Sequence, residues 1–338
     1  MSFLFKRNPK TPQELVRAVC ESVVKLDSNS DSTKRYQDDC SRYLKQMKGI
    51  LVGDDENMPQ PDQISYLSQE VYVTDCLYLL IYHLKKLDFD ARKDVQLIFS
   101  NLLRRQIANK SPTVDYLINS KPEIILLLLK GPESQSTGLI CGQILRDCIK
   151  YDSIVKFILG NSLFWNLFKY VQIPIFELST DSFITLHDLL TTHKSVVIGF
   201  LTSNYDQFVL NVNKLIQSAN YVTKRQSIRL LSELVTEKEN KEFLTKYFDD
   251  PTNLKIIMLI LNDKSKNLQI EGFHIFKFFI AKPKKSQKVL DILTKNKENF
   301  IAFFKTFDIE SYQDPNAIEE RNYILQTIQE LPDIERIN

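Results

Sequence analysis

The chain has 338 residues, and its 44 basic and 42 acidic residues leave a formal net charge of +2. Such a balance argues against a general nucleic-acid-binding protein, which carries a strong basic excess. Only 8 glycines are present, too few for the turns of a doubly wound or sandwich fold of this length. No stretch approaches the roughly 18 apolar residues of a membrane span, and the apolar start is too short for a signal peptide. We therefore expect a cytoplasmic protein without membrane insertion.

Hydrophobic periodicity and capping signals predict helices throughout the chain. The first follows Thr11-Pro12-Gln13-Glu14, a capping box with proline at the first helical position. The predicted helices of the first part lie at about 12–26, 32–50, 61–71, 74–86 and 90–108. Helices and short turns alternate from there to the end. Alternation of apolar and polar residues is rare and no Asn-Gly or Asp-Gly turn occurs, so no strand is expected.

A repeat appears when five segments are laid over one another: LLRRQIANK, ILRDCIKYD, LHDLLTTHK, LLSELVTEK and IFKFFIAKP. Their equivalent points, 41 to 45 residues apart, are Leu103, Leu145, Leu186, Leu231 and Phe276. Each of the last four segments is followed by a second, short apolar segment. A period in the low forties with two or three helices per unit is typical of armadillo and HEAT repeats. Such units stack into a curved solenoid, because a single unit cannot bury its apolar face.

The sequence therefore predicts an all-α, armadillo/HEAT-like helical-repeat solenoid that is curved. We expect one domain over residues 1–338. Its parts are N-terminal helices at about 12–86, repeats at about 90–308 and a C-terminal capping helix at about 316–331.

Motifs of the common catalytic, metal and cofactor sites are missing. No GxGxxG or GxxxxGK[ST] phosphate loop, no HExxH and no GxSxG motif occurs. His187 and His193 fall on different faces of a helix, which argues against a shared metal. The cysteines are Cys20, Cys40, Cys76, Cys141 and Cys148. They form no CxxC pair and are expected to be buried, reduced thiols. We expect no enzyme activity, no cofactor and no bound metal.

Cations open two long helical segments between residues 220 and 293. Lys224 and Arg225 stand at the start of the first, and Lys264 and Lys266 at the start of the second. The start of a helix favours anions, because its free N–H groups and its dipole are positive there. Together with the apolar run at 256–261, we interpret these cations as a groove for a partner segment that is both acidic and apolar. The alternative is that they are surface charges paired with nearby Glu and Asp, and that the apolar run is core.

Each of these helices also has a stripe that faces away from its apolar side. On the first helix the stripe consists of Arg225, Arg229, Ser232 and Thr236. On the second, which is apolar nearly all round, it consists of Lys266, Ile270, Phe273 and Lys277. In a solenoid such stripes line the concave inner face, which is the usual partner-binding surface.

Long blocks of the chain resemble the calcium-binding protein 39 family. The most characteristic are YVTKRQS, NLKIIMLILNDKSKNLQIEGFHIFKFFIAKPKKSQ and LDIL, and upstream FKRNPKTP, DFDARKDVQLIFSNLLRRQI and PTVDYL are similar to its other hallmarks. The resemblance runs from Ser2 to about Phe307. It implies a horseshoe of helical repeats without catalytic activity, which acts as a kinase-activating scaffold. The opening MSFLFKRNPKTP resembles fungal members, which act in polarised growth and cell separation with a germinal-centre kinase upstream of a nuclear-Dbf-related kinase.

The resemblance also implies where partners bind. In animals these are a pseudokinase with a C-terminal Trp-Glu-Phe tail, the tumour-suppressor kinase that it holds, and sterile-twenty-like kinases. Arg225, Lys255 and Met258 fall on positions of the family's tail pocket. The predicted tail-binding groove comprises Arg225, Arg229, Lys255, Met258 and Lys264. The predicted concave kinase-binding face comprises Tyr221, Lys238, Lys266, Phe273 and Lys277.

The leading hypothesis is a scaffold that binds and activates a kinase of the sterile-twenty or germinal-centre class, directly or through a pseudokinase with an acidic-aromatic C-terminal tail. Recruitment to sites of polarised growth is expected from the same resemblance. Lys241 stands where animal members carry an aromatic residue, which argues against binding the animal pseudokinase. The alternative is an armadillo-type cargo adaptor of nuclear import, although that class relies on repeated Trp and Asn and only Trp165 is present. A third hypothesis, an RNA-reading helical repeat, conflicts with the small net charge.

Overall fold

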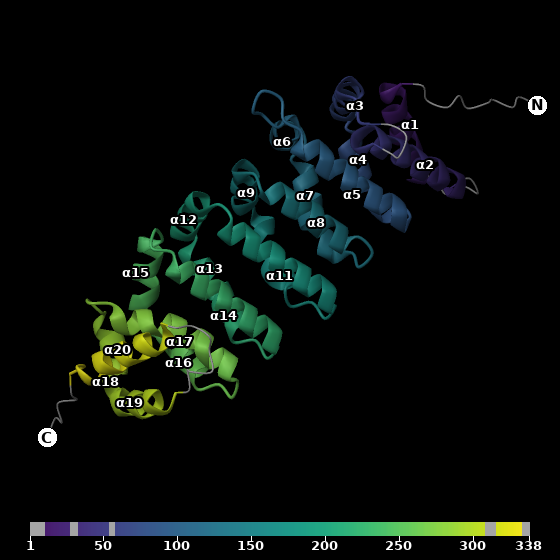
Figure 1. Cartoon of the computed structure of the whole chain (residues 1–338). Helices are drawn as coiled ribbons and strands as arrows, with labels where there is room; N and C mark the ends of the chain where they lie inside the picture. Colours follow the sequence, from purple (N-terminus) through teal and green to yellow (C-terminus); the bar gives the residue numbers. More distant parts are fainter. Residues whose placement is uncertain (1–10, 28–32, 54–57, 308–315, 333–338) are drawn as a thin grey trace, which may run out of the picture. The chain divides into compact units, whose positions relative to one another are not determined.

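The computed structural model describes residues 11–27, 33–53, 58–307 and 316–332. Every regular element in these residues is a helix, and an isolated bridge between Ile107 and Lys110 is their only β-type pairing. The chain falls into two compact units, residues 1–196 and 197–338, and Figure 1 labels most of their helices. The prediction of an all-α protein is confirmed.

The described residues of the first unit form eleven α-helices and the start of a twelfth. They are α1 (Pro12–Val24), α2 (Thr33–Val52), α3 (Pro61–Val73), α4 (Cys76–Tyr82), α5 (Phe89–Arg104), α6 (Pro112–Asn119), α7 (Glu123–Leu129), α8 (Gly138–Ile149), α9 (Asp152–Leu159), α10 (Leu167–Tyr170) and α11 (Phe176–Thr191). Short 3₁₀ helices lie at Lys25–Asp27, Leu84–Lys86, Gly131–Glu133 and Ser162–Asn166. The boundary between the units falls inside α12 (Lys194–Ser203).

In the part of the second unit that the structure describes, eight α-helices follow. They are α13 (Tyr205–Ile216), α14 (Tyr221–Thr236), α15 (Lys241–Asp249), α16 (Pro251–Leu261), α17 (Lys266–Ala281), α18 (Gln287–Lys295), α19 (Lys297–Thr306) and α20 (Ala317–Gln329). Among the described residues, no helix combines the length and the apolar character that crossing a bilayer requires.

Local signals explain where several helices begin and end. The Thr11 hydroxyl accepts a hydrogen bond from the Glu14 amide (3.1 Å), so the predicted cap of α1 is present. The predicted helix at 74–86 begins later in the structure, because Asp75 adopts a left-handed φ of 53°. The predicted helix at 90–108 ends earlier, because Arg105 adopts an extended backbone conformation with φ of −66° and ψ of 128°. Both differences arise from a single residue with non-helical backbone angles, which hydrophobic periodicity does not report.

The predicted repeat is confirmed by the long helices. The five equivalent points lie on α5, α8, α11, α14 and α17 and are at most 2 % exposed. The short apolar segments that follow form α9, α12, α15 and α18. In the first unit α5 packs against α8 and α8 against α11, and in the second α14 packs against α17. The predicted curvature and the predicted single domain concern how the two units are arranged, and they stay predictions.

Polar bonds join neighbouring long helices, and in each of them the donor or cation lies on the earlier helix. The bonds are Lys48 to Asp94 (α2 to α5, 2.5 Å), Ser100 to Asp147 (α5 to α8, 2.5 Å), Arg146 to Asp181 (α8 to α11, 2.7 Å), Arg229 to Glu271 (α14 to α17, 3.6 Å) and Lys277 to Glu320 (α17 to α20, 2.7 Å). Each of these contacts therefore has its donor or cation on the earlier helix and its acceptor on the later one, whereas the rest of the packing is mainly apolar.

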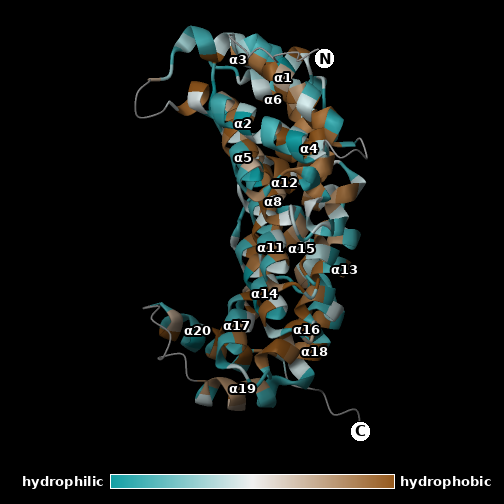
Figure 2. Ribbon diagram, turned by 90° about the vertical axis from the view of Figure 1, so that its right-hand side faces the viewer, coloured by the Kyte–Doolittle hydropathy of each residue, from teal (hydrophilic) through white to brown (hydrophobic). Residues whose placement is uncertain are grey.

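The C-terminal helix α20 packs against α17 and α19, and it lies beside α17 in both views (Figures 1 and 2). Its buried residues include Ile324 and Ile328. Arg321 on this helix donates to the carbonyl of Phe307 (3.2 Å). In the second unit α14 packs against α17, and α20 packs against α17 in turn, so α20 continues this row of helices.

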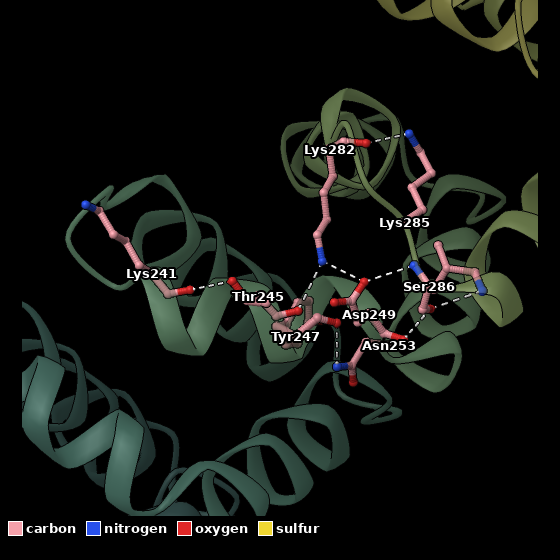
Figure 3. Close-up of polar contacts among 9 residues, drawn as sticks. Lys241, Thr245, Tyr247, Asp249, Asn253, Lys282, Lys285 and Ser286 are labelled. Atoms are coloured by element: carbon pink, nitrogen blue, oxygen red, sulfur yellow. Dashed lines mark hydrogen bonds and ion pairs between the residues drawn. The ribbon is translucent and has the colours of Figure 1, made fainter.

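A cluster of hydrogen bonds holds the α17–α18 connection against the end of α15 (Figure 3). Asp249 Oδ1 accepts from Lys282 Nζ (2.6 Å) and from the Ser286 amide (3.1 Å), and the Ser286 hydroxyl donates to the Asp249 carbonyl (2.8 Å). Lys285 Nζ donates to the carbonyls of Ile280 and Lys282 (2.8 and 2.7 Å), and burial lowers the pKa of Lys285. These bonds satisfy carbonyls that helix ends leave unpaired.

Candidate partner-binding site

A hollow of about 630 Å³ lies between α16 and α19 in the second unit. The residues that line it are Lys255, Met258, Leu259, Leu261, Asn262, Asn296, Asn299, Phe300 and Phe303. Most of this lining is apolar, three of its members are amides, and Lys255 is its charged member. We name it the α16–α19 hollow.

The helix α16 lines this hollow with apolar side chains, because apolar residues occur on its exposed side as well as on its buried side. It begins at Pro251 after Asp250, whose side chain accepts from the Thr252 amide (2.7 Å). The ribbon of α16 is drawn largely in brown in Figure 2, the colour of hydrophobic residues. Leu259 is 66 % exposed although it lies on this apolar helix. An exposed leucine beside a hollow is an apolar contact that a partner can cover.

Lys255 and Met258, both predicted for the groove, meet in this hollow. Met258 is half-buried and Lys255 is exposed. Lys255 Nζ forms no ion pair with a described residue. Its charge is therefore available to a bound anion.

The predicted groove residues Arg225 and Arg229 lie on α14, where they approach Glu271 of α17. Arg229 Nε is 3.6 Å from Glu271 Oε1. Burial raises the pKa of Glu271, and the charges of Arg229 and Arg225 oppose that shift. Arg225 Nε is buried and has no hydrogen-bond partner among the described residues. Such an unsatisfied donor is costly, and an acceptor from a partner would relieve it.

The start of α14 rests on the turn between α16 and α17. Lys224 Nζ pairs with Asp263 Oδ2 at 3.3 Å. Hydrogen bonds with Ser265 and Asn267 lower the pKa of the Tyr221 hydroxyl. These contacts hold the cationic start of α14 beside the start of α17.

The same turn connects the hollow with the α14–α17 side. Asn262 lines the hollow, and the next residue, Asp263, contacts the start of α14. Lys264 follows it, is exposed and forms no ion pair with a described residue. The five predicted groove residues thus fall in three neighbouring places: the hollow, the α14–α17 side and the turn between them.

Of the five residues predicted for the concave kinase-binding face, Phe273 is buried, and the other four lie near the ends of α14 and α17. Tyr221 begins α14 and Lys238 follows its last residue, Thr236, by two positions; the helix between them is roughly 22 Å long at 1.5 Å per residue. Lys266 begins α17, near the Tyr221 end. Lys277, at the other end of α17, pairs with Glu320 of α20 (2.7 Å).

The exposed position predicted for Phe273 is wrong. Its side chain is 0 % exposed, and its ring packs against those of Phe304 and Phe307, with centroids 5.8 and 5.7 Å apart. The same stripe contains Ile270, which is 5 % exposed. The prediction placed this side of α17 at the surface. In the structure, α19 and Phe307, the residue that follows α19, cover this side. Phe273 is therefore not part of the surface that we propose below.

Sequence reasoning missed the α19 side of the hollow and the counter-charge on α17. The missed lining residues are Asn296, Asn299, Phe300 and Phe303, and the missed carboxylate is Glu271. A signal for α19 was present, since NFIAFFKTF has aromatic residues on more than one side of a helix. Nothing local marks Glu271, because its role depends on which helix α17 packs against.

The cysteines are free, as predicted, and four of the five are buried. Cys20 differs from the prediction, since it is half-buried. In the part of the chain that the structure describes, no group of three or more His, Cys, Asp or Glu side chains could hold a metal ion.

Comparison with known proteins identifies the family. A model described as Mo25-like matches residues 3–332. A human protein, calcium-binding protein 39-like, is 42 % identical over 328 residues, which cover 97 % of each chain. The Mo25-like protein of Schizosaccharomyces pombe is 38 % identical, covering 98 % of this chain and 100 % of that one. Protein HYM1 of Saccharomyces cerevisiae is also 38 % identical, covering 99 % of this chain and 86 % of that one. With a family match over nearly its whole length, this chain belongs to the Mo25-like family.

Proposed function

We propose that this protein is a non-catalytic scaffold that binds and activates a protein kinase of the sterile-twenty or germinal-centre class, directly or through a pseudokinase. Membership of the Mo25-like family supports a role in holding protein partners. The observation that carries the proposal is the α16–α19 hollow, whose lining is apolar apart from three amides and one cation. We assign it to an acidic-aromatic C-terminal tail of the kinase or pseudokinase.

The chemistry of the hollow suits such a tail. Its volume of about 630 Å³ lies in the range of small-ligand pockets, roughly 300–1,000 Å³. Met258 is unbranched and can adapt to an aromatic ring, and Phe303 offers an aromatic partner. Lys255 can pair with a carboxylate, and the amides of Asn296 and Asn299 can bond the peptide backbone.

A second anion contact is proposed on the α14–α17 side. The buried Nε of Arg225 lacks an acceptor, and an arginine can hold a carboxylate through two parallel bonds. Glu271 already balances part of this charge. A tail that reaches from the hollow past Asn262 would bring its acidic group to this place.

Activation would follow from selective binding. A scaffold that binds the active state of a kinase better than the inactive state shifts the population toward the active state. Coupling of about 1–3 kcal/mol, roughly 5–150-fold, is typical of such effects. We place this activity in the cytoplasm, in a pathway of polarised growth and cell separation, because the opening of the chain resembles fungal members of the family.

Two exposed leucines allow a matched test. Leu259 on α16 lines the hollow and is 66 % exposed, whereas Leu210 on α13 is 55 % exposed and does not line it. Leu259→Ala should weaken binding of a synthetic peptide ending in Trp-Glu-Phe by roughly 1–2 kcal/mol, from the loss of apolar contact. Leu210→Ala should leave it unchanged.

The same two variants are then tested for stimulation of a purified kinase domain of the proposed class. We expect stimulation by the full-length protein and by Leu210→Ala, and weaker stimulation by Leu259→Ala. Equal peptide binding by both variants would place the tail elsewhere. Tail binding without stimulation of any kinase of this class would contradict the proposed activity.

A further inference from the structure

Three of the five cysteines converge in the first unit, outside the proposed partner site. Cys20 lies on α1, Cys40 on α2 and Cys76 at the start of α4, and α1 packs against both other helices. A contact between the Cys20 and Cys76 thiols shifts the pKa of both groups, in opposite directions. Cys20 Sγ also lies 3.6 Å from the hydroxyl oxygen of Thr74.

The hydrogen bonds around Cys20 have a defined direction. The Thr74 hydroxyl donates to the Glu70 carbonyl (2.7 Å), so it accepts from the Cys20 thiol. The Cys76 thiol is then the donor in its bond with Cys20. This arrangement leaves the Cys20 sulfur as the acceptor of a hydrogen bond, which stabilises its thiolate.

The surroundings of Cys20 and Cys76 shift the pKa values of their thiols in opposite directions. The hydrogen bond from Cys76 lowers the pKa of Cys20. Its bond to Cys20 and its burial raise the pKa of Cys76 well above the usual range. Burial also raises the pKa of Cys40 to about 12. Of these three thiols, Cys20 is therefore the one that forms a thiolate most readily, and thiolates are the reactive species.

Accessibility points to the same residue. Cys40 and Cys76 are 0 % exposed, whereas Cys20 is half-buried. One helical turn before Cys20, Arg17 is exposed and pairs with Glu70 (2.6 Å), so this side of α1 reaches the surface. A small reagent can meet Cys20 while its neighbours stay covered.

We propose that Cys20 is a modification site for small disulfides such as oxidised glutathione, and that Cys76 resolves the adduct. In the first step the Cys20 thiolate attacks one sulfur of the disulfide, the S–S bond breaks, and one glutathione thiolate leaves. In the second step Cys76 loses its proton to that leaving thiolate or to water and attacks the Cys20 sulfur. A Cys20–Cys76 disulfide forms and the second glutathione leaves. Two thiols are oxidised and one disulfide is reduced to two thiols, so the electrons balance.

The arrangement fits the general pattern of redox-sensitive cysteines, which are accessible, form a thiolate readily and stand next to a resolving cysteine. It does not depend on the proposed scaffold function, because it uses residues of α1 and α4 alone.

The test uses the full-length protein with oxidised glutathione, followed by alkylation of free thiols, digestion without reductant and mass spectrometry. In the wild type we expect a glutathione adduct on Cys20 that is replaced by a peptide crosslinked through Cys20 and Cys76. Cys76→Ser should stop at the Cys20 adduct and lose the crosslink. Cys20→Ser should lose both products and leave Cys76 free.

Cys148→Ser is the matched control, because Cys148 is also a fully buried thiol and should not change either product. Circular dichroism and melting curves establish that each variant is folded, and Cys76→Ala replaces Cys76→Ser if the latter unfolds. The time course of the wild type tests the order of the steps without any variant. Adduct formation on Cys141 as fast as on Cys20, or a crosslink to Cys40 instead of Cys76, would overturn the proposal.

Discussion

Two arginines one turn apart on α14 test where the acidic part of a partner tail binds. Both approach Glu271, but their surroundings differ: Arg225 Nε is buried without an acceptor, whereas Arg229 is 57 % exposed and pairs with Glu271 at 3.6 Å. We therefore predict that Arg225→Ala weakens binding of a peptide ending in Trp-Glu-Phe far more than Arg229→Ala does. The two changes remove the same side chain from the same helix, so each controls for the other.

The expected magnitudes follow from burial. Removing one partner of a buried, hydrogen-bonded charge pair costs roughly 2–5 kcal/mol, much of it because the other charge is left unpaired. For Arg225→Ala this is a loss of about 30-fold or more, since every 1.4 kcal/mol is about tenfold. An exposed ion pair contributes about 0–1 kcal/mol, which is the loss expected for Arg229→Ala.

Peptide titration at low and high salt measures both losses. The effect of Arg229→Ala should vanish at high salt, because exposed charges are screened, whereas that of Arg225→Ala should persist. Melting curves serve as the folding control. If Arg225→Ala binds the peptide like the wild type, or if the two arginines lose affinity equally and in the same salt-dependent way, then the buried donor is not the contact.

Three further changes test the hollow and the packing around it. Met258→Ala should weaken peptide binding by about 1–2 kcal/mol at every salt concentration in titration, because its contribution is apolar. Phe273→Ala should lower the free energy of unfolding in urea by about 3–5 kcal/mol, since its ring is fully buried against Phe304 and Phe307; a loss below 1 kcal/mol would contradict its place in the core. Glu271→Gln should raise the free energy of unfolding at neutral pH, because burial holds the folded pKa of this carboxyl above its unfolded value of 4.5. The wild type is then favoured below pH 4.5 and loses that contribution as pH rises through the folded pKa, so urea melts should show the advantage of the variant disappearing at acid pH.

Much of the helical array could be predicted because its signals are local. The equivalent points on α5, α8, α11, α14 and α17 are buried, since a residue type recurring at one helical position reports the core side directly. The Thr11 cap could be recognised for the same reason. The start of α4 and the end of α5 could not, because Asp75 and Arg105 adopt non-helical backbone angles that neighbouring residue types do not require.

The candidate site could be predicted only in part because its surfaces come from several helices. Lys255 and Met258 were predicted from their match to positions of the family's tail pocket, and the structure brings them together in the hollow. Phe303 on the opposite wall was missed, since its role depends on how α19 packs. Phe273 was misplaced for the converse reason: periodicity gives its side of α17 but does not report that aromatic residues from α19 cover it.

In each unit the long helices pack one after another as a row, and the polar bonds between them all run in the same sense, with the donor or cation on the earlier helix. A helix such as α8 presents Asp147 to the helix before it and Arg146 to the helix after it, and α17 does the same with Glu271 and Lys277. Two such helices placed head to head would bring cation against cation and leave carboxylates unmatched. The order of the row in each unit therefore keeps each of these cations against a carboxylate. The charges thus select the order of assembly, while the apolar packing supplies its stability.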